Sequence, residues 1–137
     1  DLLERTLKRL SMFVLRAKAK LSDATDSFVL QGLAGEAVSA VGTAQAPWTC
    51  VSLGEARLIH LYPSDGAARA LWLAPAGTPA PQATALPHAT WLWGEVRSGV
   101  ATLSAPVFEA FVPQMLNYES LDGINFKKGC YPGQEVV

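Results

Sequence analysis

The chain has 137 residues, of which half are hydrophobic and 17% are charged, and its formal net charge is −1. This composition is typical of one globular domain, or of two small units sharing a core, and it excludes a disordered tail. The balanced charge gives no overall attraction to nucleic acid or to an anionic membrane. Two distant cysteines, Cys50 and Cys130, do not make a disulfide framework, and they predict reduced thiols in a cytoplasmic compartment.

The first predicted element is an amphipathic helix over residues 2–17. Its apolar residues follow steps of four and three and so share one face: Leu3, Leu7, Leu10, Val14 and Ala17. Its cations fall mostly on the other face: Arg5, Lys8, Arg9 and Arg16. This pattern favours a docked helix with a solvated outer face, and the alternative is a basic strip that meets a polyanion.

The following segments predict a small α+β layer. Strands are expected at residues 17–25, 26–33, 47–53, 56–63 and 68–75, and a short helix at 35–42. Turns are expected near residues 23–26, at Gly54-Glu55 and at residues 64–66. The fold class is therefore α+β, an antiparallel sheet with helices packed on one face.

Residues 75–87 contain four prolines and almost no large apolar side chain, which predicts a linker. A helix over residues 88–99 should end at Gly99, and residues 106–121 should be partly helical and broken by Pro113. The predicted organisation is a helix plus α+β subdomain at 1–75, a Pro/Ala-rich linker at 76–90, and a further unit at 91–137. Because the chain starts inside one predicted helix and ends inside another, we expect a fragment of a longer protein.

The segment KKGCYPGQEVV carries the chemistry. Pro132 suits the first position of a helix, and Glu135 would follow in its first turn. Cys130 would then sit just outside the positive end of that helix, close to Lys127 and Lys128. Both influences favour the thiolate, so the pKa of Cys130 should fall below that of a free cysteine. We therefore predict a nucleophilic or metal-philic thiol.

Other candidate ligands carry weaker signals. A lone cysteine is usually a small apolar filler, and we assign that role to Cys50. The chain has no CxxC pair and too few cysteines for an iron–sulfur cluster. The two cysteines with His60 and His88 lack zinc-site spacing, which predicts a strand residue at His60 and a loop residue at His88. We place Trp48 and Trp72 in the core, whereas Trp91 and Trp93 cannot share one helix face, and one of them could line a pocket.

The motif KGCYPGQE at residues 128–135 resembles the signature of the YgfZ-type folate-binding proteins, relatives of the aminomethyltransferase of the glycine cleavage system. EVRSG at 95–99, FVPQMLN at 111–117 and GINFKKGC at 123–130 follow the order and spacing of that family, whereas the first 90 residues match only in layout. The resemblance implies a ferredoxin-like antiparallel sheet with packed helices and part of the folate-binding, aminomethyltransferase-like domain. The opening strands of that domain and a C-terminal barrel would lie outside this chain.

The resemblance also implies a function and a set of residues. Tetrahydrofolate is the implied ligand, iron–sulfur enzymes or their assembly factors are the implied partners, and any contact with tRNA would be indirect. The motif assigns a reactive thiol to Cys130 with Lys128 beside it, backbone roles to Gly129 and Gly133, and folate contacts to Tyr131, Gln134 and Glu135. Arg97, Gln114, Asn117 and Tyr118 lie where further pocket residues are expected. No metal site is predicted.

A pterin ring needs a flat apolar slot with a few directed polar groups. Trp93, Phe111, Tyr118 and Tyr131 could supply the faces, Gln114, Asn117 and Glu119 the edges, and Arg97 or Lys128 a cation for the glutamate tail. We predict a tetrahydrofolate-binding accessory protein of the bacterial cytoplasm, acting in iron–sulfur cluster assembly or repair and thereby in tRNA modification. The alternatives are an aminomethyltransferase and an interaction module whose basic helix docks on tRNA or a partner. Whether the protein is itself an enzyme is left open.

Overall fold

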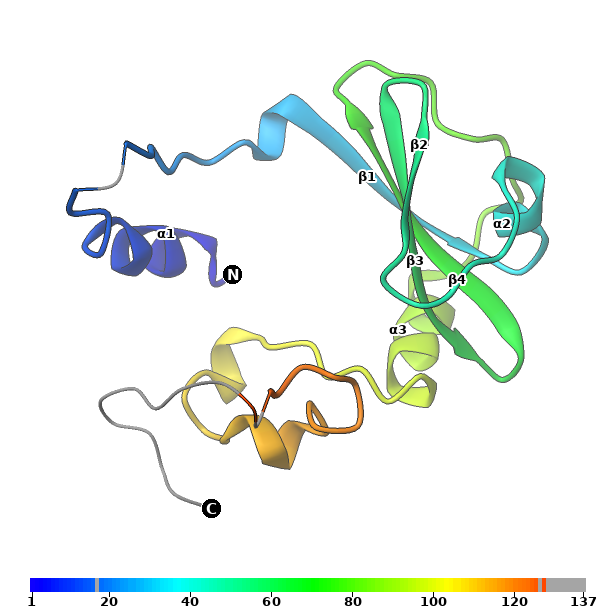
Figure 1. Cartoon of the computed structure of the whole chain (residues 1–137). Helices are drawn as coiled ribbons and strands as arrows, with labels where there is room; N and C mark the ends of the chain where they lie inside the picture. Colours follow the sequence, from blue (N-terminus) through cyan, green and yellow to red (C-terminus); the bar gives the residue numbers. More distant parts are fainter. Residues whose placement is uncertain (17, 126, 128–137) are drawn as a thin grey trace.

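The computed structural model describes residues 1–16, 18–125 and 127, and it is built around one antiparallel sheet of four strands. The strands are β1 (Phe28–Ala34), β2 (Cys50–Leu53), β3 (Ala56–Ser64) and β4 (Ala67–Pro75), in the spatial order β1-β4-β3-β2 (Figure 1). The helices are α1 (Leu3–Ser11), α2 (Glu36–Val41) and α3 (His88–Arg97), and the 3-10 turns are η1 (Thr25–Ser27), η2 (Ala105–Val107) and η3 (Pro113–Leu116). The predicted α+β class is confirmed.

Strands β2, β3 and β4 form a meander with the predicted turns. Gly54 joins β2 to β3 with a φ of 62°, a conformation that glycine adopts without strain. Asp65 and Gly66 join β3 to β4, and both have positive φ, as a type I′ hairpin turn requires. Strand β1, which precedes the meander in the chain, lies on the other side of β4 and pairs with it in antiparallel fashion from Phe28 to Ala34. The turns predicted at Gly54-Glu55 and at residues 64–66 are therefore confirmed.

The core lies between one face of the sheet and helix α2. Because successive strand residues point to opposite faces, Ala70, Trp72 and Ala74 of β4 share a face, and Leu33 and Leu58 join it from the neighbouring strands. Val38 of α2 is fully buried in the same cluster. The prediction that Trp72 belongs to the core is confirmed.

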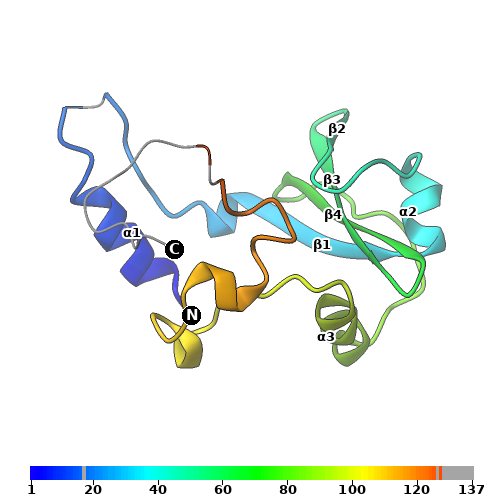
Figure 2. The same ribbon diagram turned by 60° about the horizontal axis from the view of Figure 1, so that its bottom comes forward.

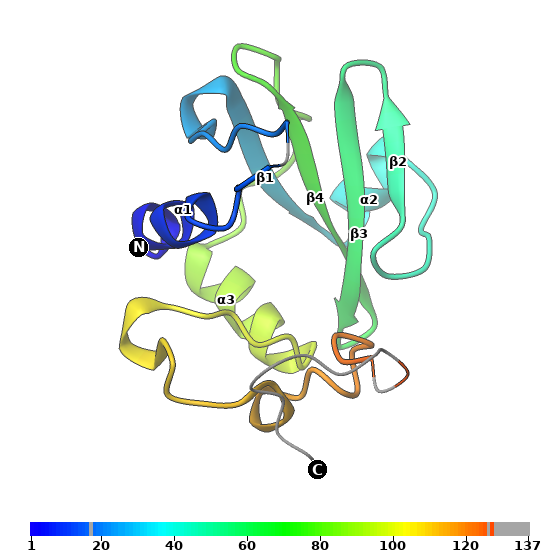
Figure 3. The same ribbon diagram turned by 60° about the vertical axis from the view of Figure 1, so that its left-hand side comes forward.

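Helix α3 packs on the opposite face, so the prediction that the helices share one face is wrong. Arg69 alternates with Ala70 along β4, and its side chain contacts Gly94 and Glu95 of α3. Figure 3 shows α2 and α3 on the two sides of the sheet. The reason is that β4 is buried on both faces along part of its length: Arg69 and Ala70 are both buried.

Two predictions for the N-terminal quarter are wrong. The first helix ends at Ser11, not at residue 17, since the Ser11 hydroxyl donates to the Leu7 carbonyl and no residue of α1 is buried to support a longer helix. No strand forms over the described part of residues 17–25. Asp23 instead accepts hydrogen bonds from the backbone N–H and the hydroxyl of Thr25, which favours a local turn over a ladder. The hydroxyl bond also lowers the pKa of Asp23.

Three further residues differ from prediction. Strand β2 begins at Cys50, not at residue 47, and Trp48 before it has a φ of 66° and is half exposed, with its ring edge-on to Tyr62 at 6.1 Å. Cys50 is exposed, because it lies on an edge strand and points away from the α2 face, so it is not a buried filler. His88 is the first residue of α3, not a loop residue, whereas His60 lies in β3 as predicted.

Beyond β4, residues 76–87 form neither helix nor strand, as expected of the proline-rich segment. Gly99 has the positive φ predicted for the end of α3, where its N–H bonds the Val96 carbonyl. Residues 106–121 contain short 3-10 turns, and Pro113 begins η3 because its missing N–H costs nothing at a helix start. Figure 2 shows this segment beside α1, in agreement with a hydrogen bond from Ala105 N to Asp1 Oδ2.

The described elements run in the order β-α-β-β-β-α after α1, which places both later hairpins before α3. A ferredoxin-like unit runs β-α-β-β-α-β, so that assignment stays a prediction, as do the boundaries at 1–75, 76–90 and 91–137. Within the described ranges no helix is long and apolar enough to cross a membrane.

Candidate functional site: an apolar cavity beside helix α3

Helix α3 is fixed to the sheet through Trp91. A Cβ on Gly32 of β1 would lie 2.7 Å from the Trp91 ring, so the indole needs a residue without a side chain at that position. The guanidinium carbon of Arg69 lies 4.4 Å from the centre of the same ring, within range of a cation–π interaction. Trp91 therefore contacts β1 and β4 together.

Arg69 and Glu95 form an ion pair within this contact. Arg69 is 3% exposed, and its guanidinium also donates to the Gly94 carbonyl at 3.2 Å and to the Ser98 hydroxyl at 3.1 Å. The other Glu95 oxygen accepts a hydrogen bond from the Thr102 hydroxyl at 3.3 Å. The pair thus links β4 to α3 and to the segment that follows α3, and most of the donors of the buried cation have partners.

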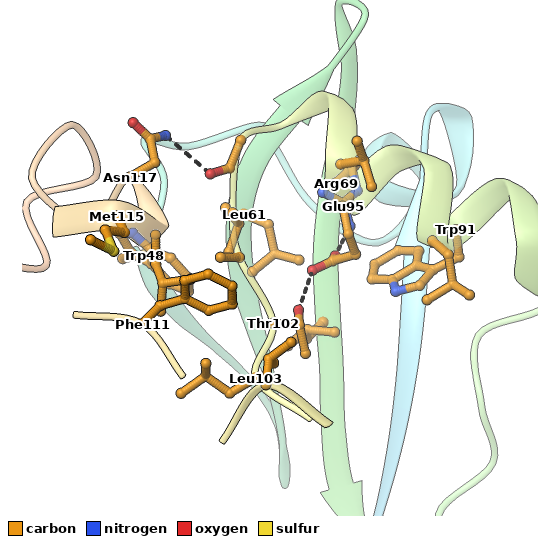
Figure 4. A pocket seen from close by; sticks show the side chains of 18 of the residues that line it. Trp48, Leu61, Arg69, Trp91, Glu95, Thr102, Leu103, Phe111, Met115 and Asn117 are labelled. Carbon is orange, nitrogen blue, oxygen red and sulfur yellow. Dashed lines mark hydrogen bonds and ion pairs between the residues drawn. The ribbon is translucent and has the colours of Figure 1, made fainter. Parts of the chain in front are cut away.

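A cavity of about 820 Å³ lies between the sheet, α3 and residues 99–117 (Figure 4). The sheet supplies Leu61 and Leu71 to its wall, α3 supplies Trp91 and Leu92, and Phe111 comes from the segment beyond α3. Trp48 and Met115 also line it, and both are labelled in Figure 4. Its volume is that of a pocket for a drug-sized molecule, and its wall is mostly apolar and aromatic.

Few polar groups face this cavity, and most are already engaged. Asn117 has a φ of 63°, and its Nδ2 donates to the Gly99 carbonyl at 3.1 Å, which leaves Oδ1 as an acceptor. Glu95 is held by Arg69 and Thr102, and His88, the first residue of α3, also lines the cavity. The cavity can therefore hold a flat apolar ring with one or two directed hydrogen bonds.

The structure brings two of the predicted pocket residues, Phe111 and Asn117, into this cavity. Tyr118 is partly buried beside it, and its hydroxyl donates to the Ala101 carbonyl at 3.2 Å. Gln114 and Glu119 are exposed and are not among the lining residues. Trp93 lines a second, smaller cavity together with Leu86, and Trp91 lines both cavities, so of the two tryptophans only Trp91 belongs to the wall of the large one.

Arg97 lies outside the large cavity. Its Nε donates to Asp65 Oδ1 at 2.9 Å, and both side chains are about half exposed. The hydrogen bond from Arg97 lowers the pKa of Asp65 below 3.8, and the same bond raises the pKa of Arg97. The stabilisation from this pair is therefore present above pH 3.8 and is lost as the pH falls through the lowered pKa. Arg97 is thus engaged with the β3–β4 turn.

The motif residues lie outside the described residues: Lys128, Gly129, Cys130, Tyr131, Gly133, Gln134 and Glu135. Their assigned roles stay predictions. Within the described part of the chain, no group of three or more His, Cys, Asp or Glu side chains could hold a metal ion.

Sequence reasoning missed most of the cavity wall, although part of it carried a signal. His88, Trp91, Leu92, Glu95 and Val96 follow one another at alternating steps of three and one, so they form one stripe along α3, and all of them line the cavity. The sequence carried no such signal for Leu61, Leu71 and Trp48, because their place in the cavity wall depends on how the sheet packs against α3 and residues 99–117.

Comparison with known proteins locates the chain among bacterial relatives. It is 47% identical over 49 residues to the "tRNA-modifying protein YgfZ" of Cronobacter sakazakii and 45% identical over 49 residues to that of Edwardsiella ictaluri. It is 39% identical over 56 residues to the protein of the same name from Aliivibrio fischeri. No model of a known protein family matches the chain, and no solved structure matches it.

These matches cover 36–41% of this chain and 15–18% of each relative. The three relatives share one name, and their matched stretches are much longer than the eight-residue motif at residues 128–135. The comparisons therefore confirm the predicted likeness of this chain, over that part of its length, to the YgfZ-type proteins.

Proposed function

We propose that the chain is part of an accessory protein of bacterial tRNA modification, which binds tetrahydrofolate beside α3 and acts through the thiol of Cys130. The support from the relatives is their shared name, tRNA-modifying protein. The observation that carries the proposal is the cavity of about 820 Å³ that joins Phe111 and Asn117, two residues predicted for a folate pocket, to Trp91. Iron–sulfur enzymes or their assembly factors are the proposed clients, and the cytoplasm is the proposed compartment.

The described residues fit one end of tetrahydrofolate. Trp91 and Phe111 offer aromatic faces for a pterin, and Asn117 Oδ1 is an acceptor for an N–H group at the edge of the ring. The anionic glutamate tail needs a cation, and Arg69 is committed to Glu95 whereas Arg97 is committed to Asp65. We assign the cation to Lys128, which the motif places next to the reactive thiol.

An aminomethyltransferase is the less favoured function. The relatives carry a different name, and the resemblance places a cysteine at residue 130 where the aminomethyltransferases usually have none. In the proposed function the folate site and the thiol belong to one accessory protein. The proposed function is therefore measured by the activity of iron–sulfur enzymes and by the level of modified nucleosides in tRNA.

Replacing Phe111 by alanine should weaken tetrahydrofolate binding about tenfold, because one aromatic face of the cavity is lost. Calorimetric titration of the intact protein with tetrahydrofolate measures this effect. Trp93→Ala is the matched control: it also removes an exposed aromatic ring, but one that does not line the large cavity, and it should leave the affinity unchanged. A larger loss of tetrahydrofolate affinity in Trp93→Ala than in Phe111→Ala, or no binding by the unmodified protein, would overturn the proposed site.

A further inference from the structure

The N-terminal segment of residues 1–22 carries a charge opposite to that of the rest of the chain. It holds six of the eleven Lys and Arg residues and only two acidic residues, and so has a formal charge of +4. The remaining 115 residues hold five cations and ten acidic residues, a charge of −5. The net charge of −1 is therefore the sum of a positively charged N-terminal segment and a negatively charged remainder.

All six cations of this segment are exposed: Arg5, Lys8, Arg9, Arg16, Lys18 and Lys20. Among the described residues the ion pairs are Arg69–Glu95 and Arg97–Asp65, so none of these six cations is neutralised by a carboxylate there. Arg5, Lys8 and Arg9 share one face of α1, because residues three and four apart on a helix are neighbours. We call the six cations the basic strip.

The basic strip suits binding to a molecule that carries regularly repeated negative charges. Its cations extend over α1 and the nine residues that follow, and no acidic residue interrupts them between Glu4 and Asp23. Phosphates spaced along a nucleic-acid backbone attract such a row and release counterions on binding. The exposed ring of Phe13, 69% accessible, lies between the helical cations and the later ones and can stack on an unpaired base.

We propose that the basic strip binds the sugar–phosphate backbone of RNA, and that the RNA is the tRNA on which the modification pathway acts. This inference rests on the proposed function for the identity of the RNA, and it differs from what the resemblance implied, since the contact with tRNA is direct. The acidic remainder of the chain orients the encounter, because only the N-terminal surface attracts a polyanion.

The test measures binding of the intact protein to a fluorescently labelled, unmodified tRNA transcript by anisotropy at several KCl concentrations. Lys8→Gln/Arg9→Gln/Lys20→Gln should lower the affinity about tenfold at 0.1 M salt, and should reduce the slope of log K against log salt by about 2 to 3. Arg9→Gln and Arg57→Gln form a matched pair, because each removes one exposed arginine, and only Arg9→Gln should weaken binding. Unchanged affinity and slope in the triple variant would overturn the proposal.

Two further measurements distinguish RNA binding by the strip from membrane binding and from the proposed folate site. Binding of the strip to phosphatidylglycerol vesicles, with no binding of tRNA, would overturn the RNA assignment in favour of a membrane surface. Tetrahydrofolate titration of the triple variant should match the unmodified protein, since the strip lies outside the cavity. Normal tRNA binding by a protein that fails to bind tetrahydrofolate would support the strip while overturning the proposed folate site.

Discussion

Replacing Arg69 by alanine should lower the free energy of unfolding by about 3 kcal/mol, a large share of the stability of a small protein. The change leaves the Glu95 carboxylate, which is 21% exposed, without its cation in a largely buried place. It also removes the cation–π contact with Trp91 and the hydrogen bonds to Gly94 and Ser98. Urea denaturation of the intact protein measures the loss.

Removing both charges together is the control for this prediction. Arg69→Met/Glu95→Leu keeps the volume and leaves no buried charge, so it should recover most of the stability lost in the single variant. Thr102 loses its partner in the double variant, but its hydroxyl is exposed and can bond water. Two results would show that the ion pair does not hold α3 to the sheet. One is an Arg69→Ala variant as stable as the unmodified protein, and the other is a double variant less stable than Arg69→Ala.

Replacing Cys130 by alanine should abolish the support that the intact protein gives to iron–sulfur enzymes, without unfolding it. The reason is that the proposed chemistry requires a thiolate, which alanine cannot supply and no neighbouring cysteine replaces. The measurement is the activity of iron–sulfur enzymes, together with the level of modified nucleosides in tRNA, in cells that contain only the variant. A normal thermal unfolding midpoint shows that the fold is intact.

Cys50→Ala is the matched control for this loss. Cys50 is an exposed thiol on the edge strand β2, so its replacement removes one sulfur atom far along the chain from the motif. It should leave iron–sulfur enzyme activity unchanged. Normal activity in Cys130→Ala, or equal losses in the two variants, would remove the role proposed for the motif cysteine.

The sheet could be predicted largely from the sequence, because its signals are local. Strands β3 and β4 are short, largely apolar runs, Gly54 supplies the turn before β3, and Asp65-Gly66 supplies the turn between β3 and β4. The predicted strand at residues 17–25 shows the limit of this reasoning. Alternation alone indicated a strand there, but the carboxylate of Asp23 closes a local turn on Thr25.

The candidate site could be predicted only in part. Phe111 and Asn117 were found through a sequence motif, and the stripe on α3 could have been found from its helical spacing. The Arg69–Glu95 pair could not, because 26 positions separate its partners and an arginine in a strand usually indicates a solvated face. Gly32 is a similar case, since its contact with Trp91 becomes meaningful only once β1 and α3 are adjacent.

The central claim, an activated thiol at Cys130, is tested most directly by alkylation with iodoacetamide at neutral pH. Because Cys50 is exposed, it is an internal reference whose rate is not limited by burial. Mass spectrometry of the intact protein follows both sites in one experiment, and Cys50→Ser isolates the pH dependence of Cys130. We predict that Cys130 reacts far faster than Cys50, and that its rate rises with a midpoint below the pKa of a free cysteine, about 8.5. Equal rates at the two sites, with a Cys130 midpoint near that of a simple peptide thiol, would contradict the account.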